Sequence, residues 1–395
     1  MKTITTVSAL ALLTCACAAY AQTPTTPMLP SGGRDMTPLR TVQAPPPSRN
    51  VERAPVRYSW RVDPGTDIAA PQPHVTESRE YWKTVDAAEL QRGVALQATA
   101  PGALVRVSPA AGAAPVDAGA VRVTRGGRAV PLARRNSSPQ LQAAGLAVAD
   151  GTAAVQLDRS AGAGAFSVQA ADARGRYVVH VFEPESDVRM FAALGRDRVL
   201  AGGRADIAVN LQDGPTRIRG VKAGGLLVAP DGRTWPVALK PGRDGILRGQ
   251  ASMPDDVGDA PGLWEVQVFA GDGTVQRDAR TAFSVALPTA RLAGGYRFDA
   301  RRLQFTLPVE AASPGRYEAR GTLYATAPDG VARPVSVAHS AQWMSPGRGD
   351  LVLAFDRAHL PEGYGAPFEL RQLELNDQSR MAPVERRERA ARIGR

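Results

Sequence analysis

The chain has 395 residues, a formal net charge of +10 and only two cysteines, Cys15 and Cys17, both near its start. The rest of the sequence therefore cannot form disulfides or cysteine-ligated metal sites, and each domain must fold on its hydrophobic core. No second apolar run is long enough to span a membrane, so we expect no transmembrane segment in the mature chain. The length predicts two to four domains.

The positive charge comes almost wholly from arginine, because the lysines are Lys2, Lys83, Lys222 and Lys240 alone. A basic chain can bind nucleic acid or another anionic polymer through its arginines. A simpler interpretation is that a GC-rich genome replaces lysine by arginine, since acidic residues are interleaved with the basic ones along most of the chain. Nucleic acid is therefore not expected as a partner. The exception is the C-terminal tail, which we interpret as a helix or a frayed end and which contains Arg380, Arg386, Arg387, Arg389, Arg392 and Arg395.

Residues 1–21 have the pattern of a secretory signal peptide. Lys2 precedes an apolar run from Ile4 to Cys17, and Ala19-Tyr20-Ala21 has small residues where a signal peptidase cuts. The alternative is a lipoprotein signal at Cys15 or Cys17, although the residues before either cysteine lack the usual pairing of an aliphatic residue with a small one. We therefore predict an exported protein, periplasmic or extracellular.

Residues 22–56 are rich in Pro, Thr, Ser and Arg, with three consecutive prolines at Pro45-Pro46-Pro47. Such a composition has too little apolar surface to offset the entropy lost on ordering. We predict a disordered, proline-rich leader there.

The sequence after the leader consists of short runs rich in β-branched and aromatic residues, and several runs alternate apolar with polar residues. This period of two is typical of strands that bury one face. Helical periodicity is scarce, with one short turn predicted over 86–91 and another helical segment over 378–392. The strand-like runs are residues 105–107, 121–123, 177–181, 207–211, 264–268 and 351–355.

Asp-Gly pairs separate many of these runs and predict type I′ hairpin turns, in which both central residues have positive φ. Turns that recur among short strands favour β-sandwiches over βαβ units. The pairs are Asp150-Gly151, Asp231-Gly232, Asp244-Gly245, Asp272-Gly273 and Asp329-Gly330.

An internal repeat divides the second half of the chain. The segments 229–237 and 327–335 share the pattern A-P-D-G followed by P-V, at an offset close to the length of an immunoglobulin-like (Ig-like) domain. We predict an all-β chain of tandem Ig-like β-sandwiches: an N-terminal β domain over 57–187, an Ig-like domain over 188–287, and a second one over 288–395 with the basic tail.

Several phrases in the sequence resemble a known family. They are Glu80-Tyr81-Trp82-Lys83, the segments 89–96 and 100–109, Tyr296-Arg297-Phe298-Asp299 and the segment 375–380. From about Tyr58 to the C-terminal tail, the chain is similar to exported bacterial proteins grouped as domain-of-unknown-function family 4785. The resemblance implies an N-terminal β domain followed by Ig-like domains in secreted proteins of Gram-negative bacteria, some of them candidates for type II secretion. It implies no activity and no functional residue.

Catalytic motifs are missing from the sequence. The histidines after the leader, His74, His180, His339 and His359, are far apart, and neither H-E-x-x-H nor G-x-S-x-G occurs. A histidine within a strand, such as His180, is more often structural than catalytic. We predict no catalytic, cofactor-binding or metal-binding residue, and no cofactor.

Two features leave a binding site open. The acidic loop with Asp255, Asp256 and Asp259 either binds calcium or is a solvated turn. The tryptophans in or beside strands either pack in a sandwich core or, if exposed along a groove, bind a carbohydrate or peptide. These tryptophans are Trp82, Trp235, Trp264 and Trp343.

Three hypotheses follow. The first is a non-catalytic protein whose Ig-like modules bind a protein or a cell-envelope or extracellular ligand, by loops or by strand addition. The second is a secreted hydrolase that uses two close carboxylates in a concave pocket of residues 58–186, with the Ig-like modules as spacers; a flat polar surface there would count against it. The third is an anionic-polymer binder that acts through arginine.

Overall fold

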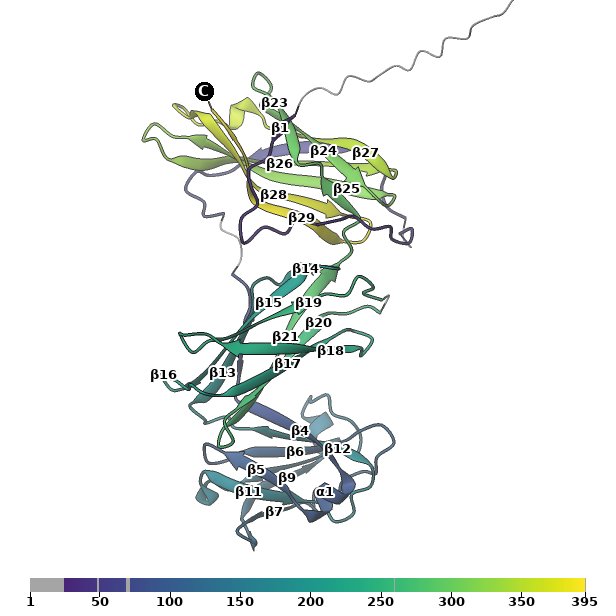
Figure 1. The fold of residues 1–395 in the computed structure, drawn as a ribbon, viewed down its shortest axis with the longest axis vertical. Helices are drawn as coiled ribbons and strands as arrows, with labels where there is room; N and C mark the ends of the chain where they lie inside the picture. The colour runs from purple at the N-terminus through teal and green to yellow at the C-terminus, as the bar shows by residue number, and fades with distance from the viewer. Residues whose placement is uncertain (1–24, 48–49, 69–71, 259, 395) are drawn as a thin grey trace, which may run out of the picture.

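The computed structural model describes residues 25–47, 50–68, 72–258 and 260–394, which form three β-rich domains stacked along one axis (Figure 1). Each domain has its own cluster of buried apolar side chains. The predicted all-β chain of tandem β-sandwiches is confirmed. The predicted signal peptide, with Cys15 and Cys17, lies outside the described residues. None of the helices in the described residues is long and apolar enough to cross a membrane.

The N-terminal domain packs two antiparallel sheets, with the orders β4-β12-β6-β10-β9 and β5-β11-β7-β8. The predicted helical turn at 86–91 is confirmed as α1, where the side chain of Asp86 accepts a hydrogen bond from Glu89 N at 2.7 Å. The elements are β4 (Glu80–Asp86), α1 (Ala87–Arg92), β5 (Val94–Ala98), β6 (Leu104–Pro109), β7 (Arg122–Arg125), β8 (Arg128–Ala129), β9 (Leu132–Ser137), α2 (Ser138–Ala143), β10 (Ala153–Leu157), η1 (Arg159–Ala161), β11 (Gly164–Gln169) and β12 (Arg176–Phe182).

The middle domain is a sandwich in which strand order runs β13-β15-β19-β18-β17-β20-β21, with β14 parallel to β21. Its strands alternate buried and half-buried residues, as in β20, where Trp264, Val266, Val268 and Ala270 face the core. The strands are β13 (Val188–Leu194), β14 (Arg198–Leu200), β15 (Arg204–Asp213), β16 (Thr216–Arg217), β17 (Lys222–Val228), β18 (Thr234–Pro241), β19 (Leu247–Ser252), β20 (Trp264–Gly271) and β21 (Gln276–Ala286).

The C-terminal domain packs the sheet β2-β26-β25-β28-β29 against a second sheet of β1, β23, β24, β22 and β27. Strands β1 and β2 come from the N-terminal segment of the chain. The elements are β1 (Thr26–Pro27), β2 (Val56–Arg61), β22 (Ala290–Leu292), β23 (Gly295–Asp299), β24 (Gln304–Ala311), β25 (Gly315–Thr326), β26 (Ala332–Met344), β27 (Gly347–Ala354), η2 (Arg357–His359), β28 (Gly365–Asp377) and β29 (Ala382–Ile393).

The prediction of a disordered leader over 22–56 is wrong for the part that the structure describes. Met28 and Met36 are buried, and Met36 exchanges backbone hydrogen bonds of 2.9 and 2.7 Å with Arg386 of β29. The leader has too few apolar residues for a core of its own, but it orders by pairing with the C-terminal domain. In Figure 1 this purple segment crosses the C-terminal domain and then descends to the other two.

The leader continues past residue 56, where the prediction ends it. Strand β2 pairs with β26 of the C-terminal domain, and β3 (Val75–Ser78) pairs with β13 of the middle domain. Only at β4 does the chain enter the N-terminal domain. One segment near the start of the sequence therefore pairs with the C-terminal and middle domains before it continues into the N-terminal domain.

The predicted helix over 378–392 is also wrong, because β29 occupies that region. Val384, Ala390 and Ala391 of this strand are buried in the sandwich core. The tail arginines face acidic residues of the sheet: Arg387 Nε lies 2.8 Å from Glu385 Oε1, and Arg389 Nη2 lies 3.2 Å from Glu369 Oε2. Pairing with β28 thus orders the basic tail as a strand.

The Asp-Gly pairs do form turns, but the predicted type I′ geometry is wrong. The glycine has positive φ in each pair, for example +85° at Gly232 and +83° at Gly330, whereas the aspartates do not. In the repeated segments Gly232 N donates to Ala229 O and Gly330 N donates to Ala327 O, both at 2.9 Å. These are type I turns followed by a glycine bulge. The two copies of the repeat therefore form equivalent hairpins, β17–β18 and β25–β26.

Candidate functional site

A buried ion pair joins the N-terminal and middle domains. Arg277 of β21 and Glu183, which follows β12, have no exposed side-chain surface, and Arg277 Nη1 lies 3.0 Å from Glu183 Oε1. The guanidinium also donates to Thr99 Oγ1 at 2.8 Å, Ser186 Oγ at 2.9 Å, Val188 O at 3.0 Å and Gln276 O at 2.7 Å. All its N–H groups thus have partners. A fully hydrogen-bonded buried network specifies one arrangement of the two domains.

The neighbouring carboxylates, Asp278 and Glu80, lie opposite each other on β21 and β4. Burial raises the pKa of Asp278 to about 7; its Oδ2 accepts a hydrogen bond from Trp82 N at 2.8 Å, and its Oδ1 has no partner among the described residues. The hydrogen bond from His180 lowers the pKa of Glu80. Two carboxyls with opposed pKa shifts are typical of acid–base sites. Asp278 is fully buried, however, so its carboxyl cannot contact a substrate, whereas the Glu80 side chain is partly exposed.

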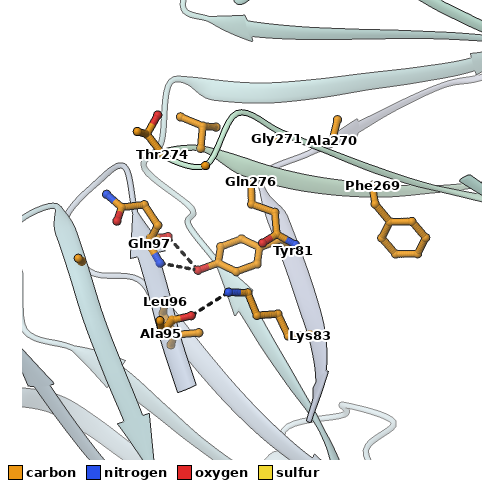
Figure 2. Close-up of a pocket in the computed structure, with 13 residues that line it drawn as sticks. Tyr81, Lys83, Ala95, Leu96, Gln97, Phe269, Ala270, Gly271, Thr274 and Gln276 are labelled. Atoms are coloured by element: carbon orange, nitrogen blue, oxygen red, sulfur yellow. Dashed lines mark hydrogen bonds between the residues drawn. The ribbon is translucent and has the colours of Figure 1, made fainter. Parts of the chain in front are cut away.

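A crevice of about 350 Å³ opens above this joint, between β4, β5 and the β20–β21 hairpin (Figure 2). The Tyr81 hydroxyl bonds to both N and O of Gln97 at 2.9 Å, and Lys83 Nζ donates to Ala95 O at 2.8 Å. These side chains form hydrogen bonds with the backbone groups on the outer edge of β5. Burial raises the pKa of Tyr81. The lining, which includes Phe269 and Gln276, contains no carboxylate. The crevice therefore lacks the two acids that the hydrolase hypothesis requires.

A second exposed feature lies on the C-terminal domain. Tyr58 and Trp60 of β2 are 51% and 41% exposed and stack against His339 of β26, with ring centroids 5.1 and 4.9 Å from the imidazole. We call these three residues the aromatic row. His339 Nδ1 contacts Glu318. Burial raises the pKa of Glu318, but His339 together with the hydrogen bonds from Gln378 and Asn376 lowers it on balance. The row is a stacking surface whose imidazole is held by a half-buried contact between His339 and Glu318.

The four histidines lie in separate places. His180 Nε2 lies 2.8 Å from Glu80 Oε2, His339 contacts Glu318, and His359 Nδ1 lies 2.9 Å from Ser336 Oγ. His74 is exposed beside Asp197 of the middle domain. Within the described ranges, no three His, Cys, Asp or Glu side chains gather as metal ligands.

The acidic loop is paired with arginines where the structure describes it. Asp255 forms an ion pair with Arg40 of the leader, and Asp256 Oδ2 lies 3.5 Å from Arg233 Nη1. Asp259 lies outside the described residues. The two described carboxylates therefore face cations of the protein itself.

The tryptophans named in the sequence analysis have different environments. Trp264 is buried and stacks on Trp235 at 5.5 Å, as expected for core packing. Trp82 lies under Arg280 at the joint, and Trp343 lies under Arg53. Sequence reasoning missed Trp60 and Tyr58, although their alternation with Arg57, Ser59 and Arg61 is a strand pattern. Tyr58 and Trp60 are exposed because β2 lies at the edge of its sheet. The sequence does not reveal that position.

Together these features define a multi-domain β-sandwich protein with a buried polar joint, a crevice beside it and an exposed aromatic row. The chain belongs to the DUF4785 family, whose description is a domain of unknown function. The family's N-terminal domain matches residues 47–183 and its C-terminal domain matches residues 289–393.

One solved structure shares the fold of this chain. A crystal structure of a DUF4785 family protein from Legionella pneumophila matches with a TM-score of 0.69 and 21% identity, over 91% of this chain and 99% of that chain. Alpha-2-macroglobulin from E. coli matches with a TM-score of 0.28 and 15% identity, over 75% of this chain and 20% of that chain. No curated protein matches the chain significantly.

Proposed function

We propose that this chain is an exported, non-catalytic binding protein that acts in the periplasm or outside the cell and binds its partner through the aromatic row. The exposure of Tyr58 and Trp60 on one edge strand carries this proposal. Aromatic side chains supply large contact areas at binding surfaces and are rarely left in solvent side by side. The partner is a protein or a component of the cell envelope.

Binding accounts for these features better than catalysis does. The carboxyl with the strongest upward shift in pKa, Asp278, has no exposed surface. The crevice beside it is lined by amides, hydroxyls, apolar groups and one cation, Lys83. This lining is unsuited to hydrolysis by a pair of carboxylates. On the outer face of β5 and β11, Ala95 is exposed, Gln97 and Ser167 are half-buried, and none of the three is acidic. These properties argue against the hydrolase hypothesis.

The binding proposal is tested by co-sedimentation of the mature chain with cell-envelope material from a Gram-negative bacterium. We expect Tyr58→Ala with Trp60→Ala to reduce the bound fraction by about tenfold or more, since each removes a large contact area. The matched control, Leu263→Ala with Val331→Ala, truncates apolar side chains that are 58% and 52% exposed elsewhere. Equal retention of the aromatic variant and the control would overturn the proposal.

The export proposal rests on the signal pattern of residues 1–21. We expect a C-terminally tagged chain to fractionate with the periplasm or the medium, and a chain lacking residues 2–21 to stay in the cytoplasm. Appearance in the medium only with an intact type II secretion system would indicate an extracellular role. A full-length chain found only in the cytoplasm would contradict export.

A further inference from the structure

Strand β2 has one free edge. Within the described residues it pairs only with β26, and the hydrogen bond of 3.0 Å from Val62 N to Val335 O sets the register. In this register Tyr58 and Trp60 direct their backbone groups to β26, whereas Arg57, Ser59 and Arg61 direct theirs away from the sheet. Three residues thus present N–H and C=O groups to an incoming strand.

The edge of β5 shows how this chain closes an edge that is not used for pairing. There Tyr81 and Lys83 fold over the strand and bond to the backbone of Gln97 and Ala95. Proteins commonly cover or charge such edges to prevent unwanted pairing. Among the described residues, no side chain covers the outward backbone groups of Arg57, Ser59 or Arg61 in this way. Within the described part of the chain, the edge of β2 is protected only by the charges of Arg57 and Arg61, so it disfavours basic or neutral strands but favours a strand of opposite charge.

The side chains of β2 define what such a strand must contain. Arg57 and Arg61 are exposed on one face and form no ion pair with the described residues, while Tyr58 and Trp60 are exposed on the other face. Residues directly opposite across two strands share a face, where opposite charges attract and aromatic groups pack with apolar ones. The complementary strand has acidic residues opposite the arginines and apolar residues opposite the aromatic side chains.

We propose that β2 binds an extended peptide segment of alternating acidic and apolar residues, which adds to the sheet as a further strand. This inference rests on the proposed binding function and names the chemistry of the partner. A second copy of this chain does not fit, because antiparallel pairing of two β2 strands centred on Ser59 would place arginine opposite arginine. Like charges directly opposite are destabilising.

The test measures fluorescence anisotropy of a labelled peptide with the core Gly-Glu-Val-Thr-Val-Glu-Gly, titrated with the full mature chain. We expect saturable binding that weakens about tenfold or more in Arg57→Glu with Arg61→Glu. That variant should gain affinity for the same peptide with lysine in place of glutamate. Such a gain would show that the variant is folded and that it lost only the charge complementarity with the acidic peptide. The matched control, Arg128→Glu, changes an exposed arginine of β8 in the N-terminal domain and should bind as the parent does.

A second peptide, N-methylated at the amides that would face β2, tests the backbone ladder. Strand addition predicts that methylation abolishes binding. Equal binding of the methylated peptide, or no saturable binding of any peptide, would overturn the inference. If Tyr58→Ala with Trp60→Ala still abolishes envelope binding in that case, the proposed function stands and only strand addition fails.

Discussion

The joint between the N-terminal and middle domains is built from buried groups, whereas the joint between the middle and C-terminal domains relies on exposed ones. At the first, Arg277 and Glu183 are fully buried and hydrogen-bonded. At the second, the polar contacts among the described residues are an ion pair between Arg40 and Asp255 and a hydrogen bond of 2.8 Å from Arg196 to Gly33 O. Buried networks fix geometry, and exposed ion pairs contribute little.

From this difference we predict that the first two domains move as one body and that the C-terminal domain with its aromatic row reorients more easily. The leader limits this motion, because it pairs with the C-terminal domain at β1 and β2 and with the middle domain at β3. If the C-terminal domain reorients, the edge of β2 can contact a partner while both joints between domains stay intact.

The largest effect is expected at the buried ion pair. Arg277→Met leaves the Glu183 carboxylate buried without its cation, which should lower the free energy of unfolding by about 3–5 kcal/mol. Adding Glu183→Gln removes the unpaired charge and should restore part of that loss. Chemical denaturation of both variants measures this, and a loss below about 1 kcal/mol in the single variant would show that this ion pair does not stabilise the joint.

The second effect depends on pH. Burial raises the pKa of Asp278 to about 7 in the folded chain, so the folded state binds a proton that the unfolded state has released. Stability should therefore fall as pH rises from about 4 to 7, by on the order of 3 kcal/mol from this group. Asp278→Asn should flatten that slope when unfolding is followed across this range. An unchanged slope would contradict the assignment.

The third effect concerns the leader. Met36→Ala removes a buried side chain from its contact with the C-terminal domain, and the leader should detach more easily by about 2 kcal/mol. Trypsin cleavage after Arg34 and Arg40 should then accelerate roughly 30-fold. Met381→Ala, a methionine that is 85% exposed, is the matched control. Equal cleavage of both variants would show that Met36 does not anchor the leader.

The smallest effect is expected at the exposed joint. Arg40→Ala with Arg196→Ala should leave the thermal midpoint unchanged, because both contacts lie at the surface. Small-angle scattering should show a broader distribution of shapes as the C-terminal domain reorients. A clear fall in the midpoint would mean that this joint also contributes to folding.

The strands and turns were predictable because each depends on neighbours in the sequence. Alternating residues define β15 and β20, and the Asp-Gly pairs mark hairpins whose exact turn type depends on one φ angle. The errors lie where a distant segment decides the structure. The leader pairs with β29 through Met36 and Arg386. The sequence pattern of neither segment indicates that the other is its partner.

The candidate sites depend still more on distance along the chain. Arg277 and Glu183 are 94 positions apart, so no local motif marks their contact. Tyr58 and Trp60 look like ordinary strand residues, and their exposure depends on β2 lying at the edge of a sheet that it forms with the distant strand β26. The sequence alone therefore predicts the class of fold and contains no catalytic motif, but it does not predict the binding edge.

Hydrogen–deuterium exchange of the full mature chain, with and without the acidic peptide, tests the central claim most directly. Strand addition at β2 predicts that the amides of Arg57, Ser59 and Arg61 exchange in the free chain and become protected when the peptide is bound. The amides of Tyr58 and Trp60, which already face β26, should change little. Protection confined to another edge, or none at all at saturating peptide, would contradict a binding role for β2.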